Sequence, residues 1–175
     1  MAGFLSYLAI RPFVADIHYH QAKKYYAQMR WRKAISELEK AIYFQRSNAE
    51  YHSKIAQIYS KISRFYRNKE DLSKAIYHFD LAIKLNPLNA FTHSYLGWTC
   101  QENEMYEQAI SEMRKAIELD PNNATFHWNL GCFYKAKGKL KEAKNEYEKV
   151  LRILPSHSQS KTALREINTK IKEEK

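Results

Sequence analysis

The chain has 175 residues, of which 45% are hydrophobic and only four are glycine, and its formal net charge at pH 7 is +10. This length is sufficient for one domain with a real core, and this composition excludes a collagen-like or disordered chain. Two cysteines, Cys100 and Cys132, are too few for a disulfide framework, and their spacing forms no zinc motif.

The first predicted element is an apolar N-terminal segment, 1–14, in which ten uncharged residues precede Arg11. A bilayer span takes about 20 apolar residues, so this segment is too short to cross a membrane. It also lacks the basic region and cleavage site of a signal peptide. We expect a helix or strap that covers the open end of the fold that follows, with the protein in the cytoplasm or at a membrane surface. The alternative is that Met1 begins within the end of a membrane helix of a longer protein.

The rest of the chain is periodic. The stretch "AIKLNPLNAFTHSYLG", 82–97, is repeated as "AIELDPNNATFHWNLG", 116–131, and the step from Pro87 to Pro121 and from Pro121 to Pro155 is 34 residues. A fixed period of this size is typical of a stacked solenoid. Counting each unit from an alanine predicts four repeats, at 15–48, 49–89, 90–123 and 124–157.

Each repeat reads as two helices. In the third repeat, apolar residues near Phe91 and Trp98 give way to a polar turn at 102–104, and Tyr106 then opens a second stripe with a spacing of three and four. A residue before proline is steered away from the helical region, so each Pro marks the break between hairpins. The sequence therefore predicts one helical hairpin per repeat.

The second repeat is seven residues longer than the others, around "SKISRFYRN", 60–68. Seven residues are almost two helical turns, about 10 Å, so the insertion lengthens a helix without rotating its faces much. One reading is that this overhang packs on its own second helix or on the N-terminal segment. The other is a docking knob with Arg64 and Arg67 at its rim.

The last element, 158–175, keeps the apolar stripe Ala163, Leu164 and Ile167 among lysines but has no second hairpin helix. It is predicted to be a capping helix with a polar outer face.

Leu-Gly early in the first helix, Ala seven residues before Ala in the second, and then Pro resemble the tetratricopeptide repeat. This resemblance covers nearly all of the chain. It implies an all-α, right-handed superhelical solenoid of four helix-turn-helix repeats plus a C-terminal capping helix. It also implies a protein-interaction scaffold without catalysis of its own, in which the first helices of the repeats line a concave groove.

The resemblance assigns ten residues to that groove, which binds an extended peptide or a partner helix. They are aromatic or polar: Tyr19, Lys23, Tyr26, Gln57, Phe91, Trp98, Gln101, Trp128, Asn129 and Lys135. Asn129 resembles the asparagine that holds a peptide backbone in several family members. The places of the family's clamp for terminal carboxylates keep only two cations, Lys23 and Lys54, so heat-shock chaperone tails are not the expected ligand.

Charge narrows the class of partner. Residues 90–134 are acidic on balance, whereas both ends of the chain are basic. A nucleic-acid binder shows a continuous basic stripe with interleaved aromatic residues, so nucleic acid is disfavoured. The basic ends instead suit an acidic protein partner or an anionic membrane surface.

A second resemblance is shorter. The apolar run followed by Arg-Pro-Phe-Val-Ala-Asp, ahead of such repeats, resembles the repeat domain behind the last membrane helix of bacterial O-antigen ligase and polymerase-like proteins. It implies an alternative function, an accessory domain of a membrane glycosyl-polymer system.

No catalytic, cofactor-binding or metal-binding residue is predicted, because phosphate-loop, dinucleotide, HExxH and nucleophile-elbow motifs are all missing from the sequence. Histidine recurs at the fourth place of every repeat, as His18, His52, His93 and His127. Neighbouring repeats lie roughly 10 Å apart, too far for two of these imidazoles to share a zinc ion. We interpret them as packing residues.

Overall fold

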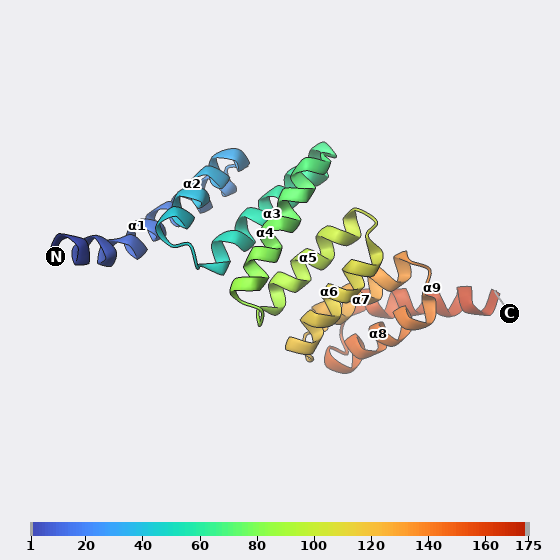
Figure 1. The fold of residues 1–175 in the computed structure, drawn as a ribbon. Coiled ribbons are helices and arrows are strands. Elements are labelled where there is room, and N and C mark those ends of the chain that lie inside the picture. The colour runs from blue at the N-terminus through green and yellow to red at the C-terminus, as the bar shows by residue number, and fades with distance from the viewer. Residues whose placement is uncertain (1, 174–175) are drawn as a thin grey trace. The chain divides into compact units, whose positions relative to one another are not determined.

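The computed structural model describes the backbone of residues 2–173 and the side chains of 9–172, and in that range the secondary structure is helical throughout. The helices, shown in Figure 1, are α1 Ala2–Ala27, α2 Trp31–Phe44, α3 Ala49–Tyr66, α4 Lys69–Leu85, α5 Ala90–Glu102, α6 Tyr106–Leu119, α7 Ala124–Ala136, α8 Leu140–Ile153 and α9 Ser158–Glu173. They form two compact units, unit 1 (1–88) and unit 2 (89–175). The predicted all-α class is confirmed.

Unit 1 consists of two helical hairpins, α1 with α2 and α3 with α4, and α2 packs against α3. Its core combines small residues with aliphatic ones. Ala15, Ala34 and Ala41 are fully buried, as is Ile55. The alanines let two helix backbones approach closely, and the larger side chains fill the space that remains.

Unit 2 repeats the same pairing, α5 with α6 and α7 with α8, with α6 against α7 and α9 against α8. Ala109, Met113, Phe133 and Tyr147 are buried in its core. On α9, Ile167 is fully buried, so this helix covers an apolar face of α8 that would otherwise meet water.

Asparagine side chains cap the N-terminus of the first helix in three of the four hairpins. Asn48, Asn89 and Asn123 precede α3, α5 and α7, and each side-chain oxygen accepts a hydrogen bond from a backbone N–H in the first turn. Such a cap satisfies one of the donors that a helix start leaves unpaired and is worth about 1 kcal/mol. Two residues after Pro87 and after Pro121, an Asn therefore restarts the helix, and Asn48 does the same without a preceding proline.

The N-terminal segment belongs to a helix, α1, which runs from Ala2 through Pro12 to Ala27 and so crosses the boundary placed at residue 14. A proline in a helix removes one backbone donor, and α1 tolerates this loss where it extends beyond the hairpin core. Ile10 and Phe13 are exposed, so these two side chains cover no core. Arg11 fastens this part of α1 by donating a hydrogen bond of 3.0 Å to the carbonyl of Tyr43 near the end of α2. Met1 lies outside the described residues. We keep the boundaries at 14, 48, 89, 123 and 157 as a proposed division.

The insertion in the second repeat lengthens both of its helices, to 18 residues in α3 and 17 in α4, whereas α5 to α8 have 13 or 14. Ile62 in the overhang is buried, while Phe65 and Tyr66 at its end are exposed. The overhang is thus part of the hairpin core at its base and free of that core at its end.

Candidate binding surfaces

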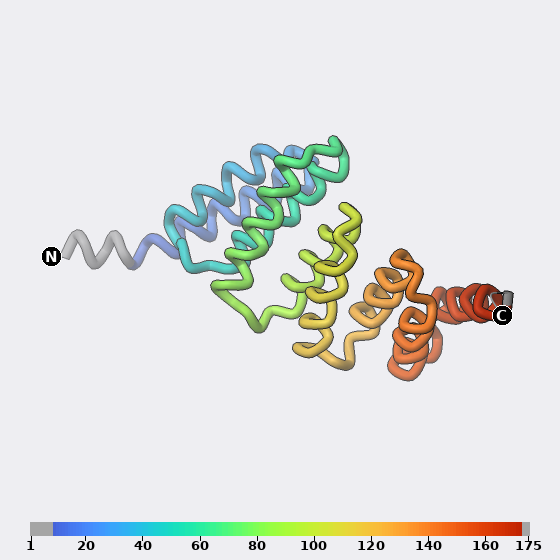
Figure 2. Tube along the Cα trace, turned by 45° about the vertical axis from the view of Figure 1, so that its right-hand side comes forward, coloured from blue at the N-terminus to red at the C-terminus, as the bar shows by residue number. Residues whose placement is uncertain are grey.

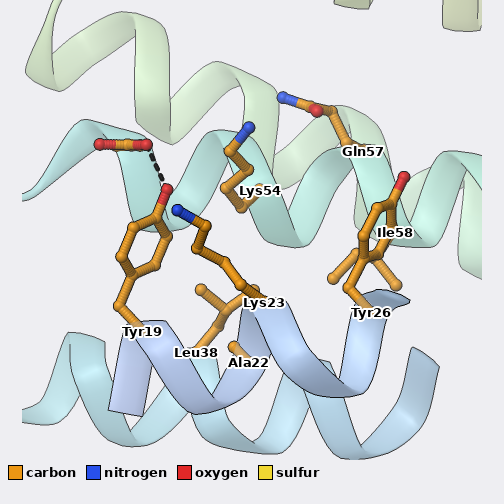
Figure 3. A pocket seen from close by; sticks show the side chains of 9 residues that line it. Tyr19, Ala22, Lys23, Tyr26, Leu38, Lys54, Gln57 and Ile58 are labelled. Carbon is orange, nitrogen blue, oxygen red and sulfur yellow. Dashed lines mark hydrogen bonds between the residues drawn. The ribbon is translucent and has the colours of Figure 1, made fainter. Parts of the chain in front are cut away.

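The first helices of unit 1 enclose an open concavity of about 470 Å³. It is lined by Tyr19, Ala22, Lys23, Tyr26, Leu38, Glu50, Lys54, Gln57 and Ile58. In Figure 3, Tyr19, Lys23 and Tyr26 extend from α1 towards Lys54 and Gln57 on α3. Four predicted groove residues, Tyr19, Lys23, Tyr26 and Gln57, therefore lie around one hollow.

One wall of this concavity is held by a hydrogen bond from the Tyr19 hydroxyl to the Glu50 carboxylate. Burial and this carboxylate raise the pKa of Tyr19 above its ordinary value, so the hydroxyl stays a donor across the physiological range. The ring also packs against Tyr51, with centroids 5.2 Å apart. Tyr19 is thus a fixed part of the wall.

Lysine side chains lie beside these rings and at the hollow. The Lys23 ammonium lies 5.4 Å from the centre of the Tyr19 ring, and Lys54 faces the same hollow from α3. At the other end, Lys61 lies 4.7 Å from the centre of the Tyr26 ring. Aromatic rings with ammonium groups at their rim can bury an apolar side chain and pair with a carboxylate of the same ligand.

In unit 2, Phe91 and Trp98 are the exposed aromatic residues of α5 that pack on α7. Phe91 is 56% exposed and meets Phe126 edge to face at 5.4 Å, and Trp98 is 37% exposed and meets Phe133 at 5.2 Å. One side of each ring is used in this packing. The rest of each ring is accessible from solvent.

Asn129 is buried and bonded within the protein. In the amide orientation that satisfies its neighbours, its oxygen accepts from Trp98 Nε1 at 2.9 Å and its nitrogen donates to the Thr125 carbonyl at 3.3 Å. Asn129 therefore orients the Trp98 indole. Holding a peptide backbone would require it to exchange this partner.

The other predicted groove residues of unit 2 are Trp128, Lys135 and Gln101, and two of them contact residues on or next to α9. Trp128 packs between Tyr147 of α8 and His157 before α9, with centroids 5.0 and 5.1 Å away. Lys135 forms an ion pair of 2.7 Å with Glu166 of α9, and Gln101 is half-buried near the end of α5. Trp128 and Lys135 thus help to hold α9, the capping helix, against the rest of unit 2.

The structure adds a set of side-chain partners that the sequence analysis missed. In three repeats the fourth-place histidine bonds through Nδ1 to a glutamate 19 residues later, at 2.7 Å in each case. The pairs are His18 with Glu37, His93 with Glu112, and His127 with Glu146. In each pair a lysine three residues after the glutamate binds its other oxygen. The signal was present in the sequence as a Glu at constant spacing from the His.

The second repeat departs from this pattern. His52 faces His78, with their Nδ1 atoms 3.2 Å apart, and Leu81 stands where the others have lysine. Burial lowers the pKa of His78 to about 4, and the neighbouring His52 acts in the same direction. Both rings are therefore neutral near pH 7, and one imidazole N–H can donate to the other.

Among the described side chains of 9–172, no three His, Cys, Asp or Glu residues lie closely enough to hold a metal ion. Within 2–173, no helix has the length and apolar character needed to cross a bilayer. The stacked helical hairpins and the open concavity lined by polar and aromatic side chains are those of a helical-repeat protein.

Comparison with known protein families identifies the type of helical repeat. Residues 56–87 and 124–157 each match a model described as tetratricopeptide repeat, and 100–136 match one described as TPR repeat. The chain belongs to the tetratricopeptide repeat family, as its sequence predicted. Such domains generally act as protein-interaction scaffolds.

Solved structures of this family share the fold. The MamA protein has a TM-score of 0.76 at 21% identity, over 88% of this chain and 80% of its own. PilF of Pseudomonas aeruginosa has a TM-score of 0.77 at 21% identity, over 93% of this chain and 71% of its own. YrrB, described as a TPR protein with an unusual peptide-binding site, has a TM-score of 0.71 at 21% identity, over 86% and 74%. No curated protein matches the chain, and these comparisons give the O-antigen ligase resemblance no support.

Proposed function

We propose that this protein is an interaction scaffold that binds an extended, partly acidic segment with an apolar anchor. The observation that carries the proposal is the unit 1 concavity, in which Tyr19, Tyr26, Lys23 and Lys54 surround one hollow. The aromatic rings offer a large apolar contact area and lose little conformational entropy on binding. The two ammonium groups favour a ligand that carries a carboxylate. Membership of a family of protein-binding scaffolds supports this reading.

In unit 2, considered by itself, Trp98 is the best candidate for a residue that contacts a ligand. Its indole is held by Asn129 and Phe133 while part of the ring stays exposed, which is the arrangement of a preorganised anchor. Trp128 contributes less to binding in this proposal because Tyr147 and His157 cover its ring.

The proposal is tested with matched peptides that share one leucine anchor and differ only in two positions, glutamate in one peptide and glutamine in the other. Fluorescence polarisation measures the affinity of each. The wild type should prefer the glutamate peptide, and Lys23→Gln with Lys54→Gln should remove that preference with little effect on the glutamine peptide.

The matched control is Lys141→Gln with Lys144→Gln, which removes two cations from α8 and should keep the preference. Far-ultraviolet circular dichroism checks that helix content is unchanged. Equal affinity of wild type and the Lys23/Lys54 variant for the glutamate peptide would exclude the concavity as the acidic-ligand site.

A further inference from the structure

The two hairpin turns of unit 1 lie at the same end of the unit, as Figure 2 shows. We call residues 29–33 and 64–69 the tip surface. The ring of Trp31, from the first turn, meets the ring of Phe65, from the second, edge to face with centroids 5.9 Å apart. The elongated α3 thus brings its exposed end beside the turn between α1 and α2.

Large apolar side chains protrude from this surface. Met29 is 78% exposed, Phe65 70% and Tyr66 66%. Phe65 and Tyr66 contact each other edge to face at 5.0 Å. Water meets most of all three side chains, so packing within unit 1 does not explain why these residue types stand here.

The charge of the tip surface has one sign. Residues 29–33 and 64–69 contain Arg30, Arg32, Lys33, Arg64, Arg67 and Lys69 and no acidic residue. Arg30 and Lys33 lie over the Tyr25 ring, which leaves their positive charge in place.

Two acidic residues directly follow the tip surface. Glu70 pairs with Lys74 at 2.6 Å and also attracts Arg32, and buried Asp71 accepts a hydrogen bond from Asn68 at 3.0 Å. Six cations against these two carboxylates leave the tip surface with a net positive charge.

Two residues of the tip surface have a left-handed backbone conformation. Met29 and Arg67 have left-handed φ values of 57° and 51°, a conformation that glycine adopts with least strain. In unit 2 the turn between α7 and α8 uses glycine, Gly138, with φ 79°, whereas the turn between α5 and α6 holds Glu104 at φ 62°. Unit 1 thus keeps a long apolar and a long basic side chain at two positions where stability favours glycine.

We propose that the tip surface docks on a membrane with anionic headgroups. Met29, Phe65 and Tyr66 would enter the boundary between headgroups and acyl chains, and the surrounding Arg and Lys side chains would pair with lipid phosphates. Protruding apolar side chains beside several cations suit a lipid interface. Met29, the most exposed of the three, has no ring on which a base could stack, whereas acyl chains can bury all three side chains.

The test measures flotation of the full chain with vesicles of phosphatidylcholine alone or of phosphatidylcholine mixed with phosphatidylglycerol. We expect binding to the mixed vesicles, little binding to phosphatidylcholine, and weakening as salt rises. Replacing Phe65 and Tyr66 by Ser should lower partitioning into mixed vesicles at least tenfold. Each cation removed from the tip surface should lower it about fivefold.

The sharpest variant is Met29→Gly with Arg67→Gly, because its two effects have opposite signs. Glycine relieves the left-handed strain, so the melting temperature should rise or stay equal. Vesicle binding should nevertheless fall, because one apolar and one basic side chain leave the tip surface. Lost binding in a protein that is at least as stable as the wild type cannot be attributed to unfolding.

The matched control is Lys141→Gln on α8, which removes one exposed cation from unit 2 and should leave flotation unchanged. Three outcomes would overturn the proposal. They are equal binding to both vesicle types, full binding by the Met29/Arg67 variant, and loss of binding only when Lys170 and Lys172 on α9 are reversed to Glu.

Discussion

Gly131 on α7 allows Tyr147 of α8 to pack directly against the helix backbone. A Cβ atom built on Gly131 would lie 2.5 Å from Cε1 and 2.7 Å from Cδ1 of the Tyr147 ring. Carbon atoms in contact prefer about 3.5–4.0 Å, so an added methyl group overlaps this ring by roughly 1 Å. Gly131→Ala should therefore disturb the α7/α8 hairpin.

The Tyr147 ring has little room to move away. Its side chain is 1% exposed, its hydroxyl donates to Cys132 Sγ at 3.5 Å, and its ring packs on Trp128. Overpacking of a closed site costs about 1–3 kcal/mol, while alanine gains about 1 kcal/mol over glycine in helix propensity. The net loss for Gly131→Ala should be about 0–2 kcal/mol, and Gly131→Leu should lose more, on the order of 1–3 kcal/mol or above.

A double-mutant cycle with Tyr147→Leu separates the two terms. In the background of the Tyr147→Leu substitution the ring is gone, so Gly131→Ala should become neutral or stabilising, with a coupling energy of about 1–3 kcal/mol. Urea unfolding followed by circular dichroism measures each corner of the cycle. Gly97→Ala is the comparison, because its Cβ would meet the Ala109 carbonyl oxygen at 3.1 Å, a contact that a small shift relieves. Additive effects of Gly131→Ala and Tyr147→Leu would refute the close-approach argument.

Three further predictions concern local interactions. Because burial holds the pKa of His78 at about 4, below the ordinary 6.5, the stability that its neutral form contributes is complete above pH 6.5 and falls as pH drops towards 4. The loss should be about 1–2 kcal/mol, since partial exposure offsets some of the burial cost, and His78→Glu should reduce it in melts across this window. Asn123→Ala removes the cap of α7 and should cost about 1 kcal/mol in urea unfolding, whereas Asn122→Ala, one residue earlier, should cost less. Zinc and chelators should leave the melting temperature unchanged, because the described side chains of 9–172 bring no three metal-ligating groups together, and chelator-induced unfolding would contradict this.

The repeat architecture was readable from the sequence because it rests on local physics. The 34-residue step, the apolar spacing of three and four, and the prolines between hairpins each act within one or two helices. The family resemblance, rather than these local rules, assigned Tyr19, Lys23, Tyr26 and Gln57 to a groove. The four side chains line one concavity of unit 1, and their role in binding stays a prediction.

Where a side chain finds its partner was decided only by the tertiary structure. Asn129 bonds to Trp98 and Lys135 pairs with Glu166, each across two helices that are not consecutive in the chain. Trp31 at the start of α2 meets Phe65 near the end of α3. Periodicity shows which face of a helix is apolar. It does not show the crossing angle and axial offset of the neighbouring helix, and a shift of one turn, about 5 Å, exchanges one partner for another. Helix propensity and apolar spacing are local and survive in any packing, whereas a hydrogen bond forms only within about 3 Å and so depends on how whole helices are seated.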